Sequence, residues 1–220
     1  MPVTINGDGT ITGYTPPIAD GSITSAKLAN GAASGSKLTM PSGSIIQLVN
    51  STLNTRGTLS ITNQYLNNSS NIYYVTGIDT TVTTTQTNSK LIISASLSGE
   101  FNNRDDFFGF VLSSTIGGTT APIDTLRAST DSKTNRPRLT AQPSICFNGT
   151  ESQSTPLTTQ FSNYFYAPSQ ASGTAITIKL GVVSHVNSSQ TFYINQCAAS
   201  NDTTDFEHLI SHMTVMEIAA

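Results

Sequence analysis

Hydrophobic and polar residues alternate with a period of two over much of the chain beyond residue 41. Leu91, Ile93, Ala95 and Leu97 occupy every second position of one stretch, with serines among the intervening residues. Successive side chains of a β-strand point to opposite faces, so this pattern predicts a half-buried strand. Alternation or short apolar runs also predict strands at 45–49, 72–75, 79–87, 107–112, 162–167, 176–182, 192–194 and 213–218. No window shows the 3.6-residue period of an amphipathic helix.

About eight strands joined by turn-rich loops, over roughly 180 residues, predict an all-β fold. The expected architecture is a jelly-roll-like antiparallel β-sandwich, and sandwiches of this length are often a single domain. The run FFGFVL at 107–112 is expected to be buried on both faces. We therefore assign residues 42–220 to one β-sandwich head domain.

Residues 1–41 differ in composition, because Gly, Ala, Ser, Thr, Asn and Asp dominate and no apolar pattern is sustained. An imperfect ten-residue repeat, DGSITSAKL at 20–28 and NGAASGSKL at 30–38, joins a turn pair to Lys-Leu. A segment of this kind buries too little apolar area to offset its ordering entropy alone. Two interpretations stay open: a flexible linker, or an extended shaft in which several chains turn Leu28 and Leu38 inward. We favour the shaft, since a linker has no need for a repeated leucine.

The polar composition is unusual, because Thr, Ser and Asn number 34, 29 and 17 and together make up 80 of 220 residues. Charged residues are 10% of the chain, against roughly 25% in ordinary soluble domains. A net charge of −3 argues against an electrostatic nucleic-acid interface. The chain has no apolar run long enough for a membrane helix and no secretory signal at its N-terminus.

Two cysteines, Cys146 and Cys197, lie far apart in the sequence. Without a secretory signal we expect them to be reduced core residues, and a disulfide between them is the alternative.

Candidate metal ligands gather in the segment DTTDFEHLISH at 202–212, where Asp205, Glu207, His208 and His212 carry the donor atoms. The spacing lacks the HExxH order of a zinc helix, and the segment leads into a predicted strand. We expect polar surface or interface histidines here, and no metal or cofactor.

Catalytic patterns are also sparse. Asp105-Asp106 is the only adjacent carboxylate pair, and we interpret it as a turn before the Phe-rich strand rather than as a glycosidase pair. No phosphate-binding loop precedes a helix, and no Gly-x-Ser-x-Gly elbow is present. The sequence therefore predicts a protein that is not an enzyme.

Four of the ten basic residues, Arg127, Lys133, Arg136 and Arg138, lie in the weakly patterned stretch 117–142. Arginine forks bind carboxylates and phosphates, and long loops on a rigid sandwich often hold binding sites. This stretch is the candidate receptor-contact loop, for acidic sugars or lipopolysaccharide phosphates. A solvated loop, or a loop with salt bridges between subunits, is the alternative.

Several stretches together resemble the C-terminal head domain of tail fibres and related appendages of tailed bacteriophages, notably marine and cyanobacterial ones. They are PSGSIIQLVNSTL at 41–53, YVTGI at 74–78, TTVTTTQTNSKLIISASLSGE at 80–100 and the terminal HMTVMEIAA at 212–220. The repeat DGSITSAKLANG resembles phage fibre shafts. The match covers most of the chain, although 101–160 match only in character. The resemblance implies a β-sandwich head assembled as a trimer, and it brings no defined binding residues.

The function expected from this resemblance is a structural virion protein, a short homotrimeric tail fibre that binds a glycan or protein on the host surface. It is assembled in the host cytoplasm and exposed to the medium, with no cofactor, nucleic acid or membrane insertion. Only about 41 residues precede the head, so we expect a short peptide that includes Thr4, Ile5, Asn6 and Ile11 to hold a tail adaptor, baseplate or capsid protein.

Two other functions remain alternatives. One is a capsid decoration, cement or head-fibre trimer that stabilises the capsid. The other is a polysaccharide-degrading spike, which the absence of Trp, the usual sugar-stacking side chain, disfavours.

Overall fold

The chain divides into two units, Met1–Met40 and Pro41–Ala220. The computed structural model describes residues 4–5, 11–12, 40–65, 71–101, 108–129, 137–142, 157–184, 189–198 and 208–220. In the first unit it describes the backbone of two short strands, β1 (Thr4–Ile5) and β2 (Ile11–Thr12). They pair antiparallel, with Thr4 opposite Thr12 and Ile5 opposite Ile11.

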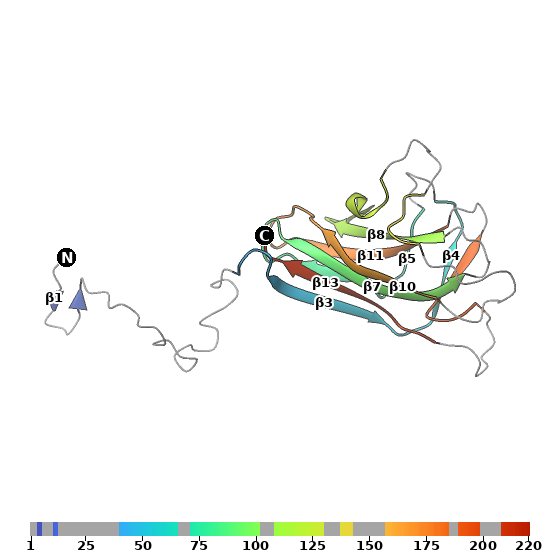
Figure 1. Ribbon diagram of the computed structural model, residues 1–220, viewed down its shortest axis with the longest axis horizontal. Coiled ribbons are helices and arrows are strands. Elements are labelled where there is room, and N and C mark those ends of the chain that lie inside the picture. Colours follow the sequence, from blue (N-terminus) through green and yellow to red (C-terminus); the bar gives the residue numbers. More distant parts are fainter. Residues whose placement is uncertain are drawn as a thin grey trace. The chain divides into compact units, whose positions relative to one another are not determined.

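Two antiparallel sheets make up the described part of the second unit (Figure 1). Sheet I contains β3 (Ile45–Leu53), β4 (Gly57–Ile61), β7 (Lys90–Phe101), β10 (Leu157–Tyr166), β12 (Gln190–Ile194) and β13 (Ser211–Ile218). Sheet II contains β5 (Tyr73–Tyr74), β6 (Thr80–Thr83), β8 (Phe108–Ile116), β9 (Thr119–Pro122) and β11 (Ala175–Ser184). A single 3₁₀ turn, η2 (Asp124–Leu126), follows β9 in the described residues.

The strand order is that of a jelly roll. Sheet I runs β3-β13-β7-β10, and β12 and β4 extend it beyond β13 along the same edge of β7. Sheet II runs β6-β11-β8-β9, with β5 beside the later part of β11. When the eight main strands are counted along the chain, these orders are 1-8-3-6 and 2-7-4-5. The predicted all-β fold, with its jelly-roll-like antiparallel sandwich, is therefore confirmed.

The core lies between the two sheets and follows the predicted alternation. The β7 residues Leu91, Ile93, Ala95 and Leu97 are all buried, and alternate residues of β11, from Ile176 to Val182, are buried with them. Phenylalanines fill the middle of the core. The Phe110 ring of β8 meets the rings of Phe161 and Phe192 edge to face, with centroids 5.8 and 6.2 Å apart. Such contacts add to the stabilisation that apolar burial itself provides.

The expectation of a half-buried β7 is wrong for its second half, because Ser96 and Ser98 are buried too. The Ser98 hydroxyl lies 2.9 Å from the Thr158 hydroxyl and donates to the Ile210 carbonyl at 3.2 Å. The Ser98 amide donates to the Ser211 hydroxyl at 3.0 Å. Side chains of the neighbouring strands thus cover these two serines, and hydrogen bonds replace the lost water.

Other strand predictions also differ from the structure, and β10 begins at Leu157 rather than at the predicted residue 162. The strand predicted at 79–87 is confined to β6, and beyond it the Thr84 amide and hydroxyl bond to the turn before β11, donating to the Thr174 and Ala171 carbonyls at 3.0 and 2.7 Å. The sequence pattern also gave no prediction for β9, or for β4, which is short and pairs with β12 at the end of sheet I.

The first and last residues of the head domain lie side by side and are joined by backbone hydrogen bonds. The Gly43 amide donates to the Ala219 carbonyl at 3.0 Å, and the Ala219 amide donates to the Ser44 carbonyl at 2.9 Å. The buried Glu217 carboxylate closes this end by accepting from the Thr85 amide at 2.7 Å and the Thr85 hydroxyl at 3.1 Å. The C-terminus accordingly lies beside the start of β3 (Figure 1). We call this region the tether end, because the chain enters the head here at Pro41.

Gly99→Ala is expected to destabilise the head by about 1–3 kcal/mol through overpacking. A Cβ at Gly99 would collide with the Phe192 ring and the Tyr193 carbonyl. Gly57→Ala is the matched control, because the nearest atom to its Cβ would be Ile194 Cδ1 at an ordinary 3.8 Å. Urea unfolding of the two variants measures the difference, and equal stabilities would contradict the packing described for β7.

Candidate functional site

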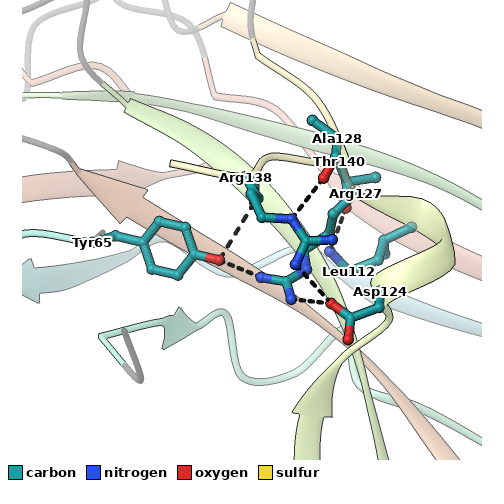
Figure 2. A network of polar contacts seen from close by, with 7 residues as sticks. All are labelled: Tyr65, Leu112, Asp124, Arg127, Ala128, Arg138 and Thr140. Atoms are coloured by element: carbon teal, nitrogen blue, oxygen red, sulfur yellow. Dashed lines mark hydrogen bonds and ion pairs between the residues drawn. The ribbon is translucent and has the colours of Figure 1, made fainter. Parts of the chain in front are cut away.

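Arg127 and Arg138, two of the four predicted receptor-contact residues, converge on Asp124 (Figure 2). The turn η2 places Asp124 three residues before Arg127, so the carboxylate lies next to the Arg127 guanidinium. Arg138 Nη1 lies 3.2 Å from the same carboxylate oxygen. The two arginine side chains are only 8% and 13% exposed, whereas Asp124 is 69% exposed. The cations therefore lie beneath the carboxylate rather than at the surface.

Further hydrogen bonds hold both arginines in place. Arg127 Nη1 donates to the Tyr65 hydroxyl at 2.7 Å, and Arg138 Nε donates to the Ala128 carbonyl at 2.7 Å. The segment after Arg138 is attached to the sandwich, because Thr140 Oγ1 accepts the Leu112 amide at 3.0 Å (Figure 2). The two guanidinium groups thus join the η2 turn to Tyr65 and Ala128.

The Asp124 carboxyl group has a pKa below its usual range, chiefly because the Arg127 side chain donates a hydrogen bond to it. The positive charges of Arg127 and Arg138 lower this pKa further. The interaction thus favours the ionised carboxylate in the folded state.

The remaining predicted site residues are described only in part. Lys133 and Arg136 lie outside the described residues, as do Asn6, Leu28 and Leu38 of the predicted anchor and shaft. Thr4, Ile5 and Ile11 lie in the β1–β2 pair. The receptor role of the basic stretch and the anchor role of the N-terminal segment remain predictions.

In the part of the chain that is described, no three His, Cys, Asp or Glu side chains gather closely enough to hold a metal ion. His208 is exposed, with its Nε2 atom 3.2 Å from Arg56 Nη1. His212 is half-buried on β13. Asp205 and Glu207 fall outside the described residues, as do Asp105, Asp106 and Cys146, while Cys197 is buried.

A pocket of about 320 Å³ lies where β3 passes into β4. We call it the Arg56 pocket. Its lining residues are Leu53, Thr55, Arg56, Gly57, Thr58, Thr76, Gly77 and Ile194. The lining thus includes three threonines and one arginine, which carry hydrogen-bonding groups, together with the apolar residues Leu53 and Ile194. Small-molecule sites commonly combine apolar walls with a few polar groups, and this volume is near the lower end of their range.

The wall of the Arg56 pocket is held from behind by two amide side chains. The buried Asn195 donates through Nδ2 to the Leu53 carbonyl at 2.9 Å and to the Thr55 carbonyl at 3.0 Å. Gln196 Nε2 donates to the Gly57 carbonyl at 2.9 Å. Because these bonds fix the backbone on both sides of Arg56, the pocket is formed in advance of any ligand.

The Thr76-Gly77 turn closes the other side of the pocket. Gly77 has a φ of +96°, a conformation that favours glycine, and a Cβ there would lie 2.9 Å from Leu53 Cδ1. Sequence reasoning missed this site because its residues come from three separate segments. The available signal was a lone arginine in the turn NTRGT at 54–58, between two stretches without charge.

No family model and no curated protein matches the chain. Among solved structures, a structure of the infectious bursal disease virus Gx strain aligns with a TM-score of 0.31 and 11% sequence identity. The alignment covers 79% of this chain and 37% of that one, so the chain spans little more than a third of that protein's length. Similarity at this level establishes neither a common fold nor a common function.

The described residues contain no helix with the length and hydropathy needed to cross a membrane.

Asp124→Asn is expected to destabilise the head by about 0.5 kcal/mol near pH 6, a small effect because water screens this exposed carboxylate. The lowered pKa means that the carboxylate stabilises the fold above roughly pH 4, the ordinary Asp pKa, and loses this effect as the pH falls through its folded-state pKa. Urea unfolding at several pH values should show the two proteins converging in acid. Thr125→Ala, in the same turn, should keep a constant offset from wild type, and a constant offset for Asp124→Asn would contradict the ion pair.

Proposed function

We propose that this chain is a structural virion protein of a tailed bacteriophage, a short homotrimeric tail fibre whose head binds a saccharide of the host surface without cleaving it. The virion setting is supported by the resemblance of 41–53, 80–100 and 212–220 to phage appendage heads. The N-terminal unit, Met1–Met40, is the part that attaches to another virion protein.

The observation that most supports receptor binding is the position of the Arg56 pocket, which lies far from the tether end. Leu53, in the pocket wall, lies eight residues along β3 from Ile45, which starts beside the tether end. At about 3.3 Å per residue, this separation is about 26 Å. The pocket and the point where the chain enters the head therefore lie at opposite ends of β3, an arrangement that suits a receptor site.

The chemistry of the pocket suits one sugar unit of a glycan. Threonine hydroxyls both donate and accept hydrogen bonds, and a guanidinium group offers several donors, so together they match the hydroxyl groups of a sugar. Leu53 and Ile194 can contact the apolar C–H groups of the ring. A site of this size binds weakly, but three pockets on one trimer, and several fibres on one virion, give strong adsorption through avidity.

The surface composition fits the same role. With 80 Thr, Ser and Asn residues and only 10% charged residues, the protein relies on hydrogen bonds for its solubility. Ionic interactions weaken in salt, whereas hydroxyl and amide groups are little affected by it. A protein exposed to the external medium benefits from this difference.

Purified full-length chain is expected to block adsorption of the virions that carry it, because it occupies the same host receptors. The measurement is the fraction of virions bound to host cells as the chain is added to saturation. No competition at saturation would contradict receptor binding, and loss of viscosity of the host polysaccharide would contradict the non-enzymatic role.

Antibody label at the tail is expected in electron micrographs, and label spread over the capsid would instead favour the decoration protein.

Thr55→Trp is expected to abolish this competition, because its bulky side chain fills the Arg56 pocket from an exposed turn without entering the core. Asn54→Trp is the matched control, since Asn54 is exposed in the same turn but does not line the pocket. Full competition by the Thr55→Trp variant would exclude the Arg56 pocket as the receptor site. The candidate receptor site would then be the basic stretch that contains Arg127, Lys133, Arg136 and Arg138.

A further inference from the structure

The outer face of sheet I, turned away from the core, carries an apolar row across four strands. Leu48 on β3 pairs with Met216 on β13, Met216 pairs with Ile92 on β7, and Ile92 pairs with Phe165 on β10. Residues in register on neighbouring strands point to the same face. Leu48 is 59% exposed and Phe165 is 51% exposed, so both ends of the row present large apolar side chains to solvent.

The next row on this face is polar, but its side chains bond to one another. Asn50 Nδ2 donates to Thr214 Oγ1 at 2.8 Å, and the Ser94 hydroxyl donates to Asn163 Oδ1 at 3.3 Å. In the row beyond, Gln160 Nε2 donates to Ser96 Oγ at 3.3 Å. Polar groups that already have partners cost less to remove from water. This face can therefore be covered at a low desolvation cost.

The three rows carry no carboxylate, and His212 is their one ionisable side chain among the described residues. Lys90 lies at the border, with its ammonium group 5.8 Å from the centroid of the Phe165 ring. A face of one charge repels a copy of itself, whereas a nearly neutral face does not. The charge pattern thus places no charge repulsion in the way of a neighbouring copy that covers this face, as the head-to-tail contacts of a trimer require.

The dimensions of the face suit such a contact. β13 has eight residues and is about 27 Å long, and four strands about 4.8 Å apart span about 19 Å. The flat area of this face is then about 500 Å², and a neighbouring copy that covers it buries a similar area of its own, about 1,000 Å² in total, the lower bound for a specific protein interface.

We infer that the outer face of sheet I is the surface by which copies of this chain associate, with the row from Leu48 to Phe165 at its centre. The inference rests on the homotrimer of the proposed function and assigns its interface. It also explains why exposed leucine and phenylalanine occur in register on strands that are 117 residues apart in the chain.

The test compares full-length wild type with Leu48→Asp and Phe165→Asp, separately and combined, by sedimentation equilibrium. Wild type is expected to be a trimer, and the double variant a monomer or at least a hundredfold weaker in association. Thr119→Asp is the matched control, because Thr119 is exposed on sheet II and should leave the trimer intact. Circular dichroism checks that every variant retains the β-sandwich, and Leu48→Asp alone, on the edge strand β3, provides a second variant with little risk to folding.

The outcomes separate this inference from the proposed function. If the double variant is still a trimer, the interface assigned here is wrong, and the homotrimer of the proposed function is not contradicted. A monomeric wild type over the whole concentration range would overturn both the interface and the trimeric fibre. Adsorption competition by the wild-type chain reports on receptor binding independently of either result.

Discussion

β7 shares hydrogen bonds with three strands, β10 along one edge and β13 and then β12 along the other, and its register holds both faces of sheet I in place. Because side chains alternate with a period of two, a shift of one residue would turn Leu91 and Ile93 outward and bring Ile92 and Ser94 into the core. The Arg56 pocket depends on the same register. The backbone amide of Asn195, whose side chain holds the pocket wall, donates to the Ser98 carbonyl of β7 at 2.9 Å. The core, the pocket wall and the outer face thus all depend on the register of β7.

Among the described residues, polar side chains bond mostly to other polar side chains or to the backbone, rather than in ion pairs. Glu217 closes the tether end through hydrogen bonds to Thr85, and Asn195 holds the pocket wall. Where charges occur, as in Arg127 and Arg138 with Asp124, they fasten a segment to the sandwich. A chain with few charges can therefore be firmly folded, because its hydroxyl and amide groups take over the specific polar contacts.

Much of the fold could be predicted from the sequence, because burial of alternate residues is a local property of each strand. The alternation at Leu91–Leu97 and Ile176–Val182 predicted both central strands, and the absence of a helical period predicted the all-β class. Short β4 and the buried Ser96 and Ser98 could not be predicted, since their burial comes from strands that are distant in sequence. The pairing order 1-8-3-6 and 2-7-4-5 was likewise expected only as a class of fold.

The candidate site shows the limit of local reasoning more clearly. The sequence by itself determined that the chain is an all-β protein with a hydroxyl-rich, weakly charged surface, because composition and period need no knowledge of contacts. Only the tertiary structure decided which arginines face solvent: Arg127 and Arg138 lie beneath Asp124, while Arg56 borders a pocket. Only the register across four strands placed Leu48 in one row with Phe165. The physical reason is that pockets and surface patches form where distant segments meet, and such meetings leave little trace in the local sequence.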